Sequence, residues 1–165
     1  MRTQKKENKM ISVKDVSTTD ELEKTLSRVR PDEMDRYYAE EEARLIQEKR
    51  PFMAFMDELI RRCGMTKQAL LLKANIPEKY GYRLLEEERH SRKRDIYLRL
   101  CFAAGVDLNE AQRALRLAGH EKLYARIPRD AAFIVALNEH MDVDAVNELL
   151  ERYGLEPLAP CGDSE

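Results

Sequence analysis

Apolar residues recur along this chain at helical spacing, and the clearest run begins after Pro51. It falls at i, i+3, i+4, i+7, i+8 and i+11, which puts its members on one face of a helix that ends at Gly64: Phe52, Phe55, Met56, Leu59, Ile60 and Cys63. Comparable patterns, bounded by threonine, proline or glycine, predict further helices over 66–74, 77–86, 92–104, 107–118, 129–139 and 142–153. The pattern as a whole predicts an all-α fold.

The apolar pattern is thinner before residue 51. Residues 1–17 are polar and lack periodicity, so we expect a disordered tail. Over 18–50 we expect a helical arm, with a first helix capped by Thr18 or Thr19 and a second, charge-rich helix over 32–49. The second helix has one thin apolar stripe, which would pack on the main body or bind a partner.

Composition narrows the class of protein. A chain of 165 residues can bury one compact domain with extensions, and 43% hydrophobic with 36% charged residues suits amphipathic helices. No segment approaches the roughly 20 apolar residues of a membrane span, and the polar start lacks the apolar centre of a secretory signal. Cys63, Cys101 and Cys161 lack the spacing of a zinc or redox site, and we interpret Cys63 and Cys101 as small buried hydrophobes. We therefore expect a cytoplasmic protein without a membrane span.

The carboxy-terminal half contains an internal repeat with an offset of 35 residues. The matched pairs are Arg94-Asp95 with Arg129-Asp130, Asp107 with Asp142, Leu115 with Leu150, Gly119 with Gly154, Glu121 with Glu156 and Leu123 with Leu158. Two helical hairpins of similar design therefore follow one another, and such units bury their faces by stacking. We expect a main domain over 51–127, extended by a second hairpin over 128–158 and followed by a tail over 159–165.

Charge is distributed unevenly along the chain, although the net charge is only -2. Residues 61–99 carry 11 basic and 5 acidic side chains, whereas 31–60 and 100–165 are acidic. A local basic stretch can attract phosphate even when the whole chain is acidic. A solvated helix face has the same composition, so charge alone leaves both interpretations open.

The segment from Met65 to Glu110 resembles the Xre-type regulators related to the phage repressors Cro and CI. The resemblance lies in the order of its parts: a helix capped by Thr66, the turn Asn75-Ile76-Pro77, a second helix, a basic loop, and a helix closed by Gly105. The chain is also similar to small bacterial regulators of this kind with a helical carboxy-terminal extension, through Tyr80-Gly81-Tyr82, Gln112-Arg113, Ala118-Gly119, Leu123-Tyr124, Arg129-Asp130, Ala136-Leu137-Asn138 and Asn147-Glu148-Leu149-Leu150. The resemblance implies a lambda-repressor-like helix-turn-helix bundle extended by the second hairpin.

The resemblance also implies roles for individual residues. Leu70, Ile76 and Leu84 would hold the two motif helices at a fixed angle, so that the second helix can enter the major groove. The residues placed near base edges are Glu78, Lys79, Tyr82 and Arg83, and those placed near backbone phosphates are Thr66, Lys67, Arg89, Arg92, Lys93 and Arg94. An arginine at position 83 can hold guanine O6 and N7 with two hydrogen bonds, a lysine does so less directionally, and a glutamate accepts from the cytosine amino group.

Three departures from the family pattern support a rival interpretation. Glu86-Glu87-Glu88 stands where the family has a glycine followed by basic residues, and carboxylates repel phosphate. Gly81 replaces a β-branched residue and costs about 1 kcal/mol of helix propensity relative to alanine. Tyr80 and Tyr82 would suit contact with a protein. The rival is a helical adaptor that keeps the fold without strong DNA binding and uses Tyr80, Tyr82 or the N-terminal arm.

No feature of the sequence indicates an enzyme. His90, His120 and His140 are isolated in the sequence, no glycine motif cradles phosphate, and we expect neither a cofactor nor a metal site. The first interpretation is therefore a sequence-specific DNA-binding transcriptional regulator that binds double-stranded DNA as a homodimer. The dimer contact would come from the arm with Tyr37 and Tyr38, or from the last hairpin through Phe133, Val135, Leu137, Leu149 and Leu150.

Overall fold

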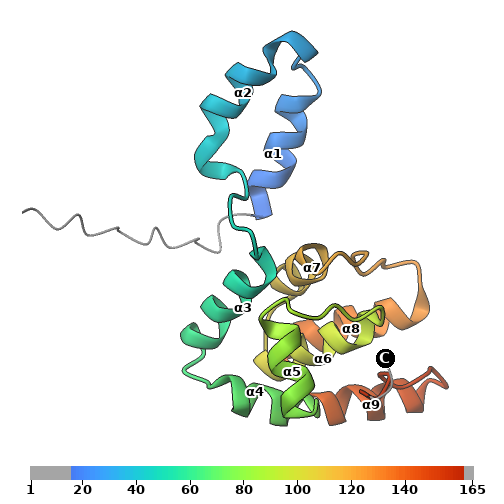
Figure 1. Cartoon of the computed structure of the whole chain (residues 1–165). Coiled ribbons are helices and arrows are strands. Elements are labelled where there is room, and N and C mark those ends of the chain that lie inside the picture. The colour runs from blue at the N-terminus through green and yellow to red at the C-terminus, as the bar shows by residue number, and fades with distance from the viewer. Residues whose placement is uncertain (1–15, 162–165) are drawn as a thin grey trace, which may run out of the picture. The chain divides into compact units, whose positions relative to one another are not determined.

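The computed structural model describes residues 16–161, and every regular element in that range is a helix (Figure 1). The all-α prediction is therefore confirmed for this part of the chain. Residues 1–15 of the expected tail lie outside the described range, as do residues 162–165. The chain divides into two compact units, one ending at Ile46 and one beginning at Gln47, and we describe each by itself.

The N-terminal unit contains α1 (Val16–Leu26) and α2 (Met34–Glu41), with the short 3-10 helices η2 (Pro31–Glu33) and η3 (Glu42–Arg44) on either side of α2. Arg44 connects the helices, because its guanidinium donates to Glu21 at 3.0 Å and to Glu41 at 3.1 Å. Tyr37 is buried and Tyr38 is 54% exposed.

This unit departs from the expected arm in two ways. α1 begins at Val16, so Thr18 and Thr19 lie inside the helix and neither caps it. The expected helix over 32–49 is also wrong, because regular α-helix ends at Glu41 and Leu45 has extended backbone angles. The sequence beyond Tyr38 has few apolar residues, and a short helix without a packed face is marginal in water.

The C-terminal unit is built from seven α-helices within the described residues. They are α3 (Pro51–Arg62), α4 (Lys67–Ala74), α5 (Glu78–Leu85), α6 (Arg94–Ala104), α7 (Leu108–Leu117), α8 (Pro128–Asn138) and α9 (Val143–Arg152). These bounds agree with the predicted helices to within about two residues. The reason is that helix-capping signals mark the ends locally: the side chains of Thr66, Asp107 and Asp142 each accept a backbone N–H three residues later.

α6 is the central element of this unit. Every residue from Ile96 to Ala104 is buried, including the charged Arg99. α4, α7 and α9 pack on α6, while α3 packs on α7 and α5. The guanidinium of Arg99 donates to Ala74 O at the end of α4 and to Leu158 O and Ala159 O in the C-terminal segment. A buried guanidinium thus joins the α4–α5 region to the end of the described chain.

The two cysteines expected in the core, Cys63 and Cys101, differ in their exposure to solvent. Cys101 is 1% exposed, and burial raises the pKa of its thiol to about 12. Cys63 is exposed, contrary to the prediction. It occupies the C-cap position of α3, where the helix ends and the chain turns at Gly64.

The 35-residue repeat has a structural counterpart in two helical hairpins that exchange contacts. Arg94 of the first hairpin binds Asp130 of the second through two hydrogen bonds, one of them 3.1 Å. Arg129 binds Asp95 in return at 3.0 and 2.7 Å. The same carboxylates accept equivalent backbone N–H groups at 2.9 Å, those of Tyr124 and Ala159.

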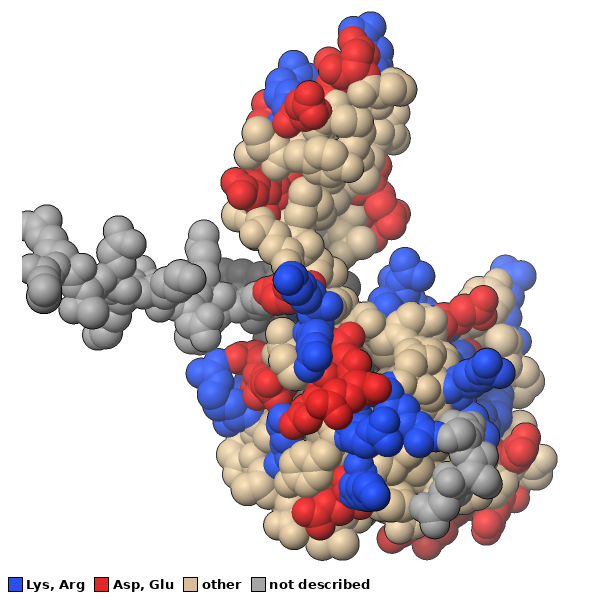
Figure 2. All heavy atoms as spheres, viewed as in Figure 1, with Lys and Arg blue, Asp and Glu red and all other residues tan. Residues whose placement is uncertain are grey.

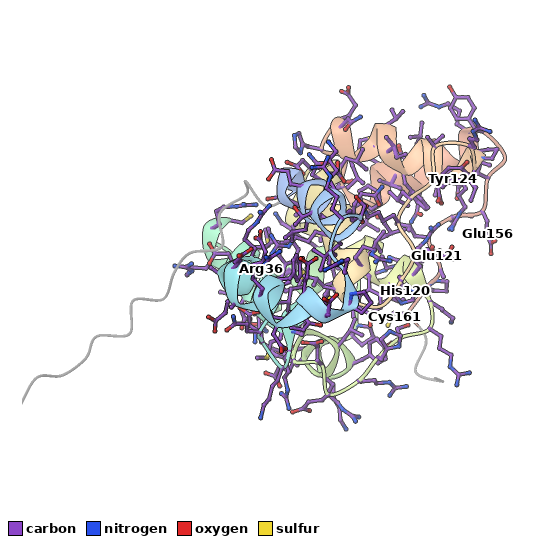
Figure 3. The ribbon with its side chains drawn as sticks, turned by 90° about the horizontal axis from the view of Figure 1, so that it is seen from above. Arg36, His120, Glu121, Tyr124, Glu156 and Cys161 are labelled. Carbon is purple, nitrogen blue, oxygen red and sulfur yellow. The ribbon has the colours of Figure 1, made fainter. Side chains whose placement is uncertain are left out.

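The exchanged ion pairs show an arrangement that differs from the expected stacking of the second hairpin on the first. A stacked repeat uses two different faces, whereas here the same face of each hairpin meets the other, as in an isologous two-fold interface. The helix contacts have the same symmetry. The second helix of each hairpin packs on the first helix of the other, α7 on α8 and α9 on α6. Each hairpin is closed in the same way, since Gln112 bonds the backbone of Leu123 and Asn147 that of Leu158. Tyr124 and Glu156 of the two closing segments lie toward the outer edge of this unit (Figure 3).

Candidate nucleic-acid interface

α4 and α5 are two short helices joined by a three-residue turn. Asn75 in the turn has a left-handed φ of 54°, which ends α4 and redirects the chain. Leu70, Ile76 and Leu84 have exposures of 0%, 5% and 1%, so the three residues expected to fix the helices are in the core. The turn therefore holds α5 rigidly against α4.

Gly81 of α5 packs directly against the side chain of Leu71 in α4. A Cβ atom at this position would sit 2.2 Å from Leu71 Cδ2 and 2.7 Å from Leu71 Cδ1, closer than any side chain can approach. The glycine therefore has a packing cause, and it costs helix propensity in exchange for a close helix contact.

The opposite face of α5 is open to solvent. Glu78, Lys79 and Arg83 are exposed, and Lys79 and Arg83 are four residues apart, which puts them on the same face. Within residues 16–161 no ion pair involves either cation at 4.0 Å or less. Tyr82 is half-buried against the core, so it lies at the margin of this face. The structure therefore brings Lys79 and Arg83 together and sets Tyr82 apart from them.

Tyr80 is also partly packed. Its ring contacts the core, and the guanidinium of Arg89 lies 4.9 Å from its centroid in a cation–π arrangement. The backbone N–H of Arg89 donates to Arg83 O at 3.1 Å, which folds the following loop back on α5. Arg89 is thus held beside α5 by its backbone and its side chain.

The three glutamates after α5 have separate environments. Glu87 has a left-handed φ of 54°, and its carboxylate accepts the N–H of Met53 in the first turn of α3 at 3.1 Å. Glu86 lies 3.8 Å from Lys67 Nζ, and its backbone carbonyl accepts from Arg50 at 3.1 Å. Glu88 is exposed. Two of the three carboxylates therefore have protein partners, a helix N-terminus and a lysine.

The two residues at the start of α4 that were expected near phosphate both have partners within the protein. The hydroxyl of Thr66 caps α4 by accepting the N–H of Ala69 at 3.0 Å. Lys67 Nζ lies 3.4 Å from Asp57, so its charge is balanced inside the protein. Gln68, which the sequence pattern did not single out, is exposed next to them in the first turn of α4.

Beyond α5, Arg92 and Lys93 are exposed, and Lys93 N donates to Ser91 Oγ at 3.1 Å. Arg94 was expected near a backbone phosphate, and the structure corrects this prediction. Its guanidinium is engaged by Asp130, which is 1% exposed, and an uncompensated charge at Asp130 would be costly. Arg94 therefore joins the two hairpins, and its guanidinium is already engaged by Asp130.

Two of the histidines are not isolated in space. The rings of His90 and His120 stack with centroids 5.3 Å apart, and the Tyr97 ring lies 4.9 Å from His120. His90 Nε2 donates to Ala118 O at 2.8 Å, and His120 Nε2 donates to Ser91 O at 3.0 Å. The two histidines thus fasten the basic loop to the end of α7. Burial lowers the pKa of His120, and the neighbouring His90 lowers it further.

The surface in this region has mixed charge. Figure 2 shows basic and acidic side chains lying close together on the visible face of the C-terminal unit, with no large field of one sign. On this face, attraction for phosphate would therefore come from individual basic side chains and not from a broad positive field.

Little else in the described residues suggests a chemical site. A shallow pocket of about 260 Å³ lies between the α4–α5 turn and the C-terminal segment, and it is lined by Leu71, Leu72, Asn75, Ile76, Pro77, Pro160 and Cys161. Within residues 16–161 no three metal-binding side chains gather, and no helix is long and apolar enough to cross a membrane.

Comparisons of this chain with protein-family models, curated proteins and solved structures found no match. A function for the chain therefore has to be inferred from the residues of α4, α5 and the loop that follows them.

Proposed function

We propose that the C-terminal unit binds double-stranded DNA as a lambda-repressor-like helix-turn-helix regulator of transcription. The observation that carries this proposal is the two-sided nature of α5. One side is fixed to α4 through Gly81 and Leu84, and the other presents Lys79 and Arg83 to solvent. A helix of eight residues is about 12 Å long, which suits a major groove about 12 Å wide.

In this proposal Lys79 and Arg83 reach base edges, and Glu78 accepts from a cytosine amino group beside them. Thr66, at the positive end of α4, and the loop residues Arg89 and Arg92, with Lys93, contact backbone phosphates and set the orientation of α5. Lys67 contributes less, because Asp57 and Glu86 already balance its charge.

The environments of the glutamates support this proposal. Glu87 is held against the N-terminus of α3, and Glu86 lies near Lys67, so neither is a free carboxylate. Glu88 is the remaining repulsive group, and it argues for modest affinity.

The adaptor remains the second candidate, and the mixed surface charge favours it. The tyrosines give it less support than the sequence suggested, because Arg89 lies over the Tyr80 ring and both tyrosines contact the core. Salt dependence distinguishes the two functions: phosphate contacts weaken steeply with added salt, whereas a protein interface built on aromatic burial does not.

The test is fluorescence-anisotropy titration of labelled random duplex and of fragments from the protein's own promoter, at about 50 and about 200 mM salt. We expect one fragment to bind more tightly than random duplex, with affinity that falls with salt. Lys79→Ala/Arg83→Ala should weaken specific binding by about tenfold or more. The matched control is Arg116→Ala/Lys122→Ala, which removes the same charge from exposed positions outside this region and should bind normally.

Absence of binding at the lower salt would reject the DNA-binding function. Equal losses in the test and control variants would reject the assignment to α5, since general charge would then explain the affinity.

A further inference from the structure

The pseudo-two-fold arrangement of the hairpins leaves one helix face without its counterpart. In the first hairpin, α4 packs on α6, and Arg99 donates to Ala74 O across that contact. The α6 residues on this side include Ile96, Leu100 and Ala103, with exposures of 1%, 0% and 7%. In the second hairpin, α8 corresponds to α6, but within the described residues of the C-terminal unit only α7 and α9 pack closely on α8, and neither takes the place that α4 has on α6.

The exposed surface of α8 falls at the matching positions. A stripe with the spacing i, i+4, i+7, i+8 and i+11 runs along the side of α8 away from its buried residues, and we call it the α8 stripe: Ile127, Ala131, Ile134, Val135 and Asn138. Ile127, Val135 and Asn138 are exposed, whereas Ala131 and Ile134 are half-buried and Ile134 also packs against the core. Val135 is 54% exposed and Ile127 47% exposed, whereas the α6 residue equivalent to Val135, Leu100, is 0% exposed. Tyr124, 55% exposed, adjoins the stripe through the turn that bonds Ile127 N to Tyr124 O.

We infer that the α8 stripe binds the α8 stripe of a second copy of this chain, with the two helices antiparallel. The charges at the two ends of the stripe are complementary to those of a second, antiparallel copy. Arg126, in the turn before α8, and Glu139, at its C-cap, are exposed and adjoin the opposite ends of the stripe in the sequence. Each is six to seven residues from the middle of the stripe, between Ala132 and Phe133. In an antiparallel pair, Arg126 of each copy faces Glu139 of the other.

The helix itself favours the same geometry. Ala131 and Ile134 are equally distant from the middle of the stripe, so a small residue of one copy meets a larger one of the other. Antiparallel helices also place the positive end of each beside the negative end of the other. A parallel pair would instead bring the two Arg126 side chains together and the two Glu139 side chains together.

The proposed α8 contact differs from the dimer contact that the sequence suggested for the last hairpin. Phe133, Leu137 and Leu150 are 0%, 1% and 0% exposed inside the chain, so they are not available to a second copy. Val135 is the clearly exposed member of that set, and Leu149 is half-buried. The inference stands apart from DNA binding, because it concerns a face of α8 and is tested without DNA.

Sedimentation-velocity analysis of the full chain at up to about 100 µM is the test. We expect a reversible dimer. Val135→Glu should raise the dimer dissociation constant by at least about tenfold, because it places two carboxylates in an apolar contact. Leu72→Glu is the matched control: Leu72 is 81% exposed on α4, and its replacement should leave the dissociation constant unchanged.

Charge reversal tests the antiparallel geometry independently of folding. Arg126→Glu and Glu139→Arg should each weaken the dimer, and the double variant should restore it. A monomeric wild-type chain at about 100 µM would overturn the inference. So would a dimer that Val135→Glu leaves intact, or a double variant as weak as the single ones.

Discussion

Gly81 and Glu87 are unusual residues for the helix and loop that we propose to contact DNA, and each has a cause in the packing around it. Gly81 allows α5 to meet Leu71, and Glu87 occupies a left-handed turn from which its carboxylate reaches α3. The positions of two histidines also have their cause in tertiary packing. His90 and His120 are 30 positions apart in the sequence, but they stack because the loop and the end of α7 meet.

We expect His120 to make the stability of the C-terminal unit sensitive to mild acid. Burial lowers the pKa of His120 below its ordinary value of 6.5, and although the hydrogen bond to Ser91 raises it, His90 and Arg94 lower it again. The unfolded chain takes up a proton at about pH 6.5 while the folded chain resists, so the associated stability is complete above that pH and is lost as the pH falls below it.

We therefore expect the free energy of unfolding, measured by urea denaturation, to decrease between about pH 7 and pH 5. His120→Gln should reduce this decrease, whereas His140→Gln, at an exposed helix end, should retain it. The same pH dependence in the wild type and His120→Gln would show that another group is responsible.

Helix ends account for the accuracy of the element prediction in the C-terminal unit. Threonine and aspartate caps, Pro51 and the glycine stops act over three or four residues, so the sequence displays them directly. The prediction failed before residue 51. The threonines that resemble a cap lie inside α1, α2 begins without a side-chain cap, and the apolar stripe is too thin to fix a length.

The cap supplied by Glu87 is a long-range element that no local pattern reveals. Glu87→Ala keeps the backbone strain of a side chain at positive φ but removes the acceptor for Met53 N–H. It should lower the free energy of unfolding by about 1 kcal/mol in chemical denaturation.

Glu88→Ala is the control for this experiment, because Glu88 is exposed. Its effect should stay within about 0.5 kcal/mol. Equal effects of the two substitutions would mean that net charge, and not the cap, is responsible.

At the scale of the whole molecule, we expect the exchanged ion pairs to make the two hairpins unfold together. Arg94→Ala leaves Asp130 without its buried partner and should cost about 3 kcal/mol. Arg129→Ala should cost somewhat less, since Asp95 is less buried than Asp130.

Thermal unfolding followed by calorimetry and by circular dichroism is the measurement. For wild type and both variants, we expect the C-terminal unit to unfold in a single transition. A separate early transition for α8 and α9 would show that the second hairpin folds independently, contrary to the reciprocal contacts.

The sequence by itself determined the helices of the C-terminal unit, the burial of Leu70, Ile76 and Leu84, and the existence of the repeat, because periodicity and capping are local properties. Only the tertiary structure decided that the repeats exchange contacts, that Arg94 faces Asp130, that Arg99 is buried and that Val135 is open. Each of these depends on which surfaces meet across tens of residues. A charged or apolar side chain looks the same in the sequence whether its partner is solvent, a distant carboxylate or a neighbouring helix.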